Sequence, residues 1–412
     1  MVISVFKNLI VLIPLFLISG PFLIDLAMCL LGLFIIYELI FNKNWQLINN
    51  KIFFFLIIFW LIILTSSFAS LEIKLSLEAS LFYFRFILFS LAIGFFLNKY
   101  VSLIKLLHFS IWLSFLVLIL DSHLQFLIGK NIFGIEPILK YRISSFFGEE
   151  LIMGSYLSRV LLIGLILTLI IYDKKLFDTK KTLFYSLVIS FIGSSIFLSG
   201  ERSAMFYYFL TIILSVIFSI KLRKIFLISL CVLIAMIASI SLKDYEFSKR
   251  MFNYTIYEIF PSKSEIRIFS ETHQAHYETA IKMFKDKPLI GHGPKTFRKI
   301  CNQEQYYVLY GCSTHPHNTY LQLLSETGLI GFIPIFSFFI YILFFLTRIL
   351  FKKIFYNEHQ YSDTILLLYV SFFIYLWPII PNGNFFNNWM NGIYYLLIGI
   401  SMNLYIKKID NK

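Results

Sequence analysis

The sequence predicts an all-α, polytopic membrane protein with about 12 transmembrane helices and one large loop on the outer face. Of its 412 residues, 58% are hydrophobic and only 14% are charged, whereas a soluble domain carries about 25% charged residues. Mean hydropathy is +0.79. This composition excludes a soluble enzyme and a disordered chain. The net charge of +13 does not indicate nucleic-acid binding, because most basic residues lie in short loops between apolar segments.

The apolar segments set the predicted organisation. A membrane helix needs about 20 apolar residues, and the segments of suitable length are 2–19, 22–41, 52–69, 82–98, 104–124, 151–172, 183–199, 204–220, 225–242, 319–347, 364–380 and 389–406. Residues 1–242 therefore hold the first nine helices, residues 243–318 form the long loop with short helices, and residues 319–412 hold the last three.

The distribution of Lys and Arg predicts the orientation. These residues are concentrated in the short loops on the side of the N-terminus, which the positive-inside rule places in the cytoplasm. Residues 243–318 then face outward, with a helix expected over Ala275–Phe284 that ends before Lys287-Pro288. Because such a long loop in a compact protein is usually functional, we place the chemistry there.

Two cysteines lie in this loop. Cys301 and Cys312 come just before the motif described next. We predict that they form a disulfide, because the outer compartment of a bacterium is oxidising. The alternative is two reduced thiols. A metal site is less favoured, because the CxxC spacing of zinc sites is absent.

The segment 313–334 reads STHPHNTYLQLLSETGLIGFIP. It contains His317-Asn318, nine residues, and then Gly328-x-x-Gly331. In one continuous helix both glycines would lie near the face of His317, and their small size would let a neighbouring helix approach closely. His315-Pro316 favours an extended entry into this helix, and Asn318 is a candidate N-cap. A purely structural cap is the alternative for His317.

This pattern resembles the signature of the O-antigen ligase and O-antigen polymerase family. The segments GHGPKTFRKIC (291–301) and LSGERSAMF (198–206) are also similar to family segments. The resemblance implies a multi-pass glycosyltransferase of the bacterial inner membrane with its active site facing the periplasm. It implies a glycan donor linked to undecaprenyl diphosphate, a lipid A-core or glycan acceptor, and membrane lipids as partners.

Three functions remain open at this point. A ligase would move the glycan to a lipid A-core sugar, and a polymerase would move a growing chain onto another lipid-linked unit. A polar-lipid flippase would need charges deep in several helices, whereas here they cluster at the outer end. We favour the ligase over the polymerase and both over the flippase.

Two residues are the predicted catalytic groups. His317 can accept a proton from the acceptor hydroxyl as a neutral imidazole near pH 7. Arg202 can bind phosphate oxygens bidentately and stabilise the departing diphosphate. Displacement at the anomeric carbon would then invert its configuration. The sequence has no Walker loop, HExxH, GxSxG elbow or DxD-like pair in the outer loop, so we expect no metal and no cofactor.

A larger set of residues is predicted to bind substrate. Ionisable residues inside membrane helices are costly and often functional, which singles out the arginines in two apolar segments. Their alternative role is pairing with Asp25 or Asp121, and for the loop residues it is a solvated basic surface. The predicted substrate-binding residues are Arg85, Arg142, Arg159, Lys295, Arg298, His315 and Asn318, and those predicted to be structural are Gly328, Gly331, Cys301 and Cys312.

Overall fold

The computed structural model describes residues 2–172, 177–262, 266–356 and 361–410, and within these ranges the fold is helical. One isolated bridge joins Leu139 and Arg142. The α-helices are α1 (Val2–Ile18), α2 (Pro21–Ile40), α3 (Lys51–Phe68), α4 (Ile73–Leu81), α5 (Phe84–Lys99), α6 (Ser102–Ile128), α7 (Met153–Ile171), α8 (Thr179–Ser199), α9 (Arg202–Phe218), α10 (Ile220–Lys243), α11 (Tyr245–Ser248), α12 (Tyr254–Ile259), α13 (Glu271–Asp286), α14 (Phe297–Ile300), α15 (Thr319–Phe355), α16 (Asp363–Tyr375) and α17 (Asn388–Asp410).

Each of the predicted apolar segments coincides with a helix, so the multi-pass, all-α prediction is confirmed at this level. Among the described residues, 8 helical segments are long and apolar enough to cross a membrane, and α1, α9 and α16 are shorter apolar helices. The number of 12 crossings and their orientation stay predictions.

Several boundaries differ from those predicted; α15, for example, continues to Phe355 instead of residue 347. The fourth segment is preceded by the separate helix α4, whose residues Ile73–Leu81 include Ser76, Glu78 and Ser80. Helix α16 ends at Tyr375 instead of residue 380, because Pro378 and Pro381 lack the N–H that a continuing helix requires. The chain therefore crosses the outer end of the bundle as an irregular segment over residues 376–387.

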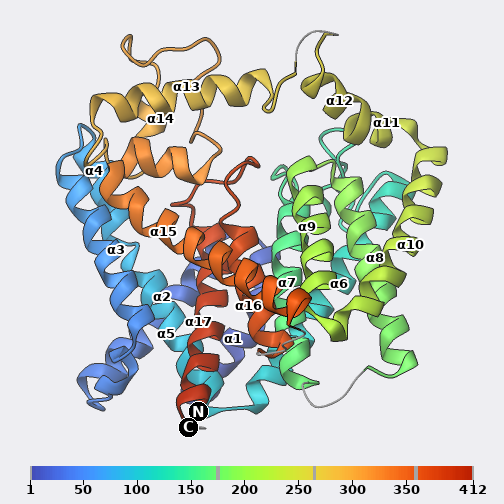
Figure 1. Ribbon diagram of the computed structural model, residues 1–412, viewed down its shortest axis with the longest axis horizontal. Coiled ribbons are helices and arrows are strands. Elements are labelled where there is room, and N and C mark those ends of the chain that lie inside the picture. The colour runs from blue at the N-terminus through green and yellow to red at the C-terminus, as the bar shows by residue number, and fades with distance from the viewer. Residues whose placement is uncertain (1, 173–176, 263–265, 357–360, 411–412) are drawn as a thin grey trace.

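The two ends of the molecule carry different elements of the chain (Figure 1). Both chain termini lie at one end, and helices α11 to α14 lie at the opposite end, where the view shows α13 running across the top of the bundle. In the interior α17 packs on α5 and α2, and α10 packs on α8. One large apolar core fills the bundle, as expected for packed amphiphilic and apolar helices.

The segment after α12 has a small core of its own. Ala280 and Met283 of α13 pack with Phe297, Ile300 and Tyr306, separate from the core of the bundle. Cys301 and Cys312 form a disulfide at the edge of this cluster. The small core and the disulfide together hold α13 and α14 as one unit above α15.

The backbone breaks at Gly328, inside α15. Gly328 has φ 63° and ψ −167°, so the helix that begins at Thr319 does not run straight through to Phe355. The prediction that Gly328 and Gly331 share a helix face with His317 is therefore wrong, because the helical period does not continue across the break. The Cβ position of Gly331 faces the side chain of Thr327 of its own segment, not a neighbouring helix.

Gly328 serves a different structural purpose. A Cβ on Gly328 would overlap the backbone of Leu289, and a Cβ on Gly291 would overlap the backbone at Glu326–Gly328. At this contact Leu329 N donates to Pro288 O at 2.8 Å, and Gly293 N donates to Glu326 O at 2.7 Å. The two glycines thus let the loop before α14 dock directly on the broken helix.

Candidate active site

Four histidines from two segments meet at the outer end of the bundle. The ring centroid of His317 lies 4.0 Å from that of His315, 5.3 Å from His276 and 5.5 Å from His273. His273 and His276 are three residues apart on α13, so they share one helix face. Among the described residues, no group of three or more His, Cys, Asp or Glu side chains is arranged to hold a metal ion.

His317 has an unusual backbone and a free ring. Its φ is 58°, a left-handed conformation that is uncommon for a non-glycine residue and is enriched at functional sites. Its carbonyl accepts a hydrogen bond from Asn382 N at 2.8 Å, which holds this conformation. The imidazole is half-buried and makes no hydrogen bond to the described residues, so its nitrogens are available to a substrate.

Burial and, to a smaller extent, the neighbouring His315, His273 and His276 together lower the pKa of His317 to about 3. The pKa of His315 falls to about 4, again mainly through burial. His317 is therefore neutral at pH 7 and able to accept a proton, but it is a weak base in the free protein. A negatively charged group nearby would raise its pKa, because opposite charge favours the imidazolium.

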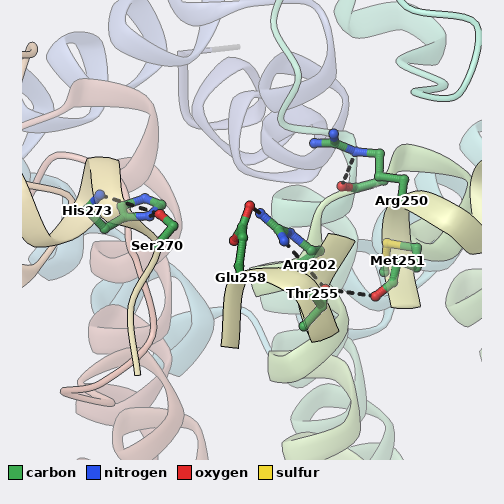
Figure 2. A network of polar contacts seen from close by, with 8 residues as sticks. Arg202, Arg250, Met251, Thr255, Glu258, Ser270 and His273 are labelled. Carbon is green, nitrogen blue, oxygen red and sulfur yellow. Dashed lines mark hydrogen bonds and ion pairs between the residues drawn. The ribbon is translucent and has the colours of Figure 1, made fainter. Parts of the chain in front are cut away.

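Arg202 begins α9 at the tight turn after α8. Its guanidinium forms an ion pair with Glu258 of α12 at 2.9 Å and donates to Thr255 at 3.5 Å. Figure 2 shows Arg202 directed at Glu258, with Ser270 and His273 across from them and Arg250 on the other side. About a third of the Arg202 side chain is exposed (31%), so a ligand can reach it.

A cavity of about 310 Å³ connects the arginine side with the histidine cluster. Its lining includes Arg202, Thr255 and Glu258 on one side and Ser270 and His273 on the other, with Arg267, Phe206 and Pro381 completing the wall. Ser270 caps α13 and also contacts His273 Nδ1 at 2.6 Å, which fixes that ring. His317 does not line this cavity but its ring contacts that of His273, so the two predicted catalytic residues are connected through His273.

Two further arginines support the turn that presents Arg202. Arg250 Nε donates to Gly200 O at 3.0 Å, and Arg142 Nε donates to Ser199 O at 3.3 Å. Burial lowers the pKa of both, repulsion from Arg202 adds to the effect, and Arg142 further lowers the pKa of Arg250. Glu201 accepts a hydrogen bond from Gly154 N, at the start of α7, at 2.6 Å. Arg142 thus lies behind Arg202, with its predicted role in substrate binding untested.

Asn382 connects the histidines to Arg159. Its carbonyl oxygen lies 3.2 Å from His315 Nε2, and its side-chain Oδ1 accepts from Arg159 at 2.6 Å. Arg159 has no acidic partner among the described residues; its guanidinium stacks over Tyr207, 4.9 Å from the ring centroid. The alternative considered for Arg159, pairing with Asp25 or Asp121, is therefore not found: Asp25 pairs with Arg85, and Asp121 accepts from Ser145 and Ile132 N.

Asn318 is the N-cap of α15, as predicted. Its Oδ1 accepts from Tyr320 N at 3.0 Å and Leu321 N at 3.1 Å, while its Nδ2 donates to Pro378 O at 2.7 Å. The amide is thus engaged by the protein on both sides. Its predicted part in substrate binding has no direct support in these contacts.

The remaining predicted binders lie apart from Arg202. Arg85 forms an ion pair with Asp25 at 2.8 Å, which is the structural alternative considered for it. Arg85 and Lys295 line a second cavity. Arg298 is exposed on α14 and lies close enough to influence both Lys295 and His315 electrostatically.

Several site residues were not singled out from the sequence. Arg250, Glu258 and Asn382 belong to this set, and His273 and His276 were not assigned a role. The three-residue spacing of the two histidines at the start of the predicted helix was an available signal, as was the asparagine-rich run 382–391 after a proline. Nothing local marks Glu258 or Arg250, because their relevance comes from contacts with a turn some 50 residues away.

A family model matches the part of the chain that carries most of these residues. Residues 185–336 match the family model described as O-antigen ligase, a segment that contains Arg202, Arg250, His273, His276 and His317. None of the curated proteins matches the chain. The matched segment runs from α8 into α15, and Arg159 and Asn382 lie outside it. The resemblance of this multi-pass membrane protein to the O-antigen ligase and polymerase family is thus confirmed over the segment that carries its candidate active site.

Proposed function

We propose that the protein is a glycosyltransferase of the O-antigen ligase type. It moves a glycan from undecaprenyl diphosphate to a lipid A-core acceptor on the periplasmic face of the bacterial inner membrane. The observation that carries this proposal is the cavity shared by Arg202 and His273, whose ring touches that of His317. A cationic group and a neutral base beside one cavity suit a donor with an anionic leaving group and an acceptor hydroxyl.

The proposed reaction uses only protein groups at the reacting atoms. The diphosphate of the donor binds at Arg202, where it replaces Glu258 as the partner of the guanidinium. The acceptor hydroxyl transfers its proton to His317 and attacks the anomeric carbon from the side opposite the diphosphate. The glycosidic bond forms as the bond to the diphosphate breaks, so the configuration inverts. The negative charge of the donor raises the pKa of His317 when the site is filled.

Purified protein in nanodiscs, assayed with a lipid-linked donor and an acceptor, tests the two roles. His317→Ala should lower the rate by about 10²–10⁴ while donor binding persists. His317→Asn should do the same, and because Asn adopts positive φ readily, it separates lost chemistry from backbone strain. Arg202→Ala should weaken donor binding by about 10- to 100-fold, and Arg202→Lys should recover part of it. Near-normal turnover by His317→Asn would remove His317 from the mechanism.

A genetic experiment separates the ligase from the polymerase. The gene is expressed in a strain that lacks its ligase, and the lipid carrier and the lipid A-core are analysed for attached polymer. Transfer of polymer to lipid A-core supports the ligase. Polymer that lengthens on the carrier without transfer would replace the ligase by the polymerase that uses the same donor class.

A further inference from the structure

A second polar cavity lies at the outer ends of α4 and α5, away from Arg202. It measures about 130 Å³, and its lining includes Glu78, Phe82, Arg85, Lys295, Phe386 and Asn388. It shares no lining residue with the cavity that contains Arg202. Figure 1 shows α4 at one edge of the outer end, with α9 and α12 on the other side of the bundle.

Lys295 is the distinctive residue of this cavity. Its φ of 62° is a conformation that lysine rarely adopts, in a chain with few such residues among those described. Glu326, fully buried in the first part of α15, accepts a hydrogen bond from Phe297 N at 3.0 Å and anchors this loop. The loop thus holds Lys295 over the cavity. Its ammonium makes no hydrogen bond or ion pair with the residues that the structure describes.

The charges around the cavity are close to balanced, and what distinguishes it is cationic side chains with unused donors. Arg85 and Asp25 neutralise one another, although Arg85 Nε stays buried without a hydrogen-bond partner. Lys295 and the nearby Arg298 face only Glu78 and the buried Glu326. Burial lowers the pKa of Lys295, and Arg298 and Arg85 lower it further, whereas Glu326 and Glu78 oppose the shift. A bound anion would offset the repulsion among these cations and favour the charged form of Lys295.

The cavity is linked to the reacting centre through residues 382–388: Asn382 O lies 3.2 Å from His315 Nε2, and Phe386 and Asn388 line the cavity. The charge of Arg298 acts on Lys295 and also on His315, whose ring is 4.0 Å from that of His317. The histidine cluster therefore borders one cavity through His273 and is connected to the second through the chain segment of Asn382. A transferase that joins two large substrates needs a binding cavity for each of them next to the catalytic base.

We infer that the cavity of Arg85, Lys295 and Asn388 binds an oxyanion carried by the acceptor saccharide, while the Arg202 cavity receives the donor diphosphate. The assignment to the acceptor rests on the proposed function, but the presence of an oxyanion site does not. The Lys295 ammonium and the Arg85 guanidinium bind the oxyanion, and Asn388 Nδ2, which donates to Asp25 at 3.3 Å, is a third donor at the wall. Phosphate and carboxylate groups share this chemistry.

Binding measurements on the full-length protein in nanodiscs test the inference with soluble probes. Glucose 6-phosphate and glucuronate represent the two oxyanions, and glucose represents the same sugar without charge. Both anionic probes should bind at least about tenfold more tightly than glucose. Lys295→Gln should weaken them about tenfold or more, and Lys295→Arg should retain most of the binding. Lys299→Gln is the matched control, an exposed lysine on the adjacent α14, and should change nothing.

A third probe keeps this inference separate from the proposed function. Geranyl diphosphate, a short analogue of the donor, should lose affinity in Arg202→Ala and keep it in Lys295→Gln, which also shows that the latter variant is folded. Three results would each contradict the second site. Glucose 6-phosphate could bind Lys295→Gln as tightly as wild type, or it could fail to bind Arg202→Ala. The third is that the anionic probes bind no more tightly than glucose. If only the geranyl diphosphate result differs, so that Arg202→Ala binds this probe as tightly as wild type, the donor assignment is contradicted and the second site is unaffected.

Discussion

The two sides of the candidate site are held by different kinds of contact. On the histidine side, residues 271–318 have their own core, a disulfide and direct backbone hydrogen bonds to α15. On the arginine side, α11 and α12 attach through Phe247 and Met251 and through the arginine contacts Arg202–Glu258 and Arg250–Gly200. Packing and backbone bonds fix the base in place, whereas charge pairs can exchange their partners for a charged ligand.

The largest expected effect is on the histidine side, where Gly328 meets Leu289. Gly328→Ala should destabilise the protein by about 1–3 kcal/mol for the positive φ and by about 1–3 kcal/mol more for the overlap with the loop backbone. Gly134→Ala is the matched control, because Gly134 has φ 79° but open space around its Cβ position. Thermal unfolding midpoints measure both. Equal losses in the two variants would mean that the docking of the loop on α15 contributes nothing.

Replacing Asn382 should lower activity, because this residue contacts both Arg159 and the histidine segment. Asn382→Ala removes the acceptor of Arg159, and we expect kcat to fall about tenfold or more through misplacement of the adjoining His315–His317 segment. Asn382→Asp keeps an acceptor oxygen and should recover part of the rate. The donor KM should change little, because Asn382 does not line the cavity of Arg202. A rise in donor KM with unchanged kcat would contradict a positioning role.

Replacing Glu258 should have a smaller effect than replacing Asn382, and it should improve donor binding instead of lowering activity. Glu258 is partly exposed, like Arg202 (36% and 31%), so their ion pair contributes little to stability. Glu258→Gln removes a carboxylate that competes with the donor diphosphate, and donor KM should fall by about 2- to 5-fold. Glu246→Gln, which removes an exposed carboxylate of the neighbouring α11, is the control. Weaker donor binding in Glu258→Gln would show that the carboxylate positions Arg202.

The smallest expected effect is the pH dependence of stability. Burial lowers the pKa of His317 to about 3 and of His315 to about 4, whereas the unfolded chain has a histidine pKa near 6.5. Below about pH 6.5 the unfolded state binds more protons, so stability should be complete above this pH and decrease as the pH falls toward 4. Unfolding midpoints of wild type and His317→Asn measure this, and the variant should lose less. Parallel pH profiles would contradict the shift at His317.

Much of the fold follows from local properties of the sequence. Apolar length is a property of each segment alone, which is why α1 to α3 begin and end close to their predicted limits. The cap at Asn318 is likewise local, since the amide bonds backbone groups two and three residues ahead. The break at Gly328 is not local, because it depends on a loop almost 40 residues earlier that docks against it.

The sequence by itself determined the all-α, multi-pass class, the family resemblance, and the residue types available for phosphate binding and proton transfer. These depend on hydrophobicity and short motifs, which need no knowledge of distant contacts. Only the tertiary structure decided that His273 connects Arg202 to His317, that Asn382 joins the histidines to Arg159, and that Arg85 and Lys295 share a separate cavity. Such contacts form when helices far apart in the chain pack together, and packing depends on the whole core rather than on any one segment.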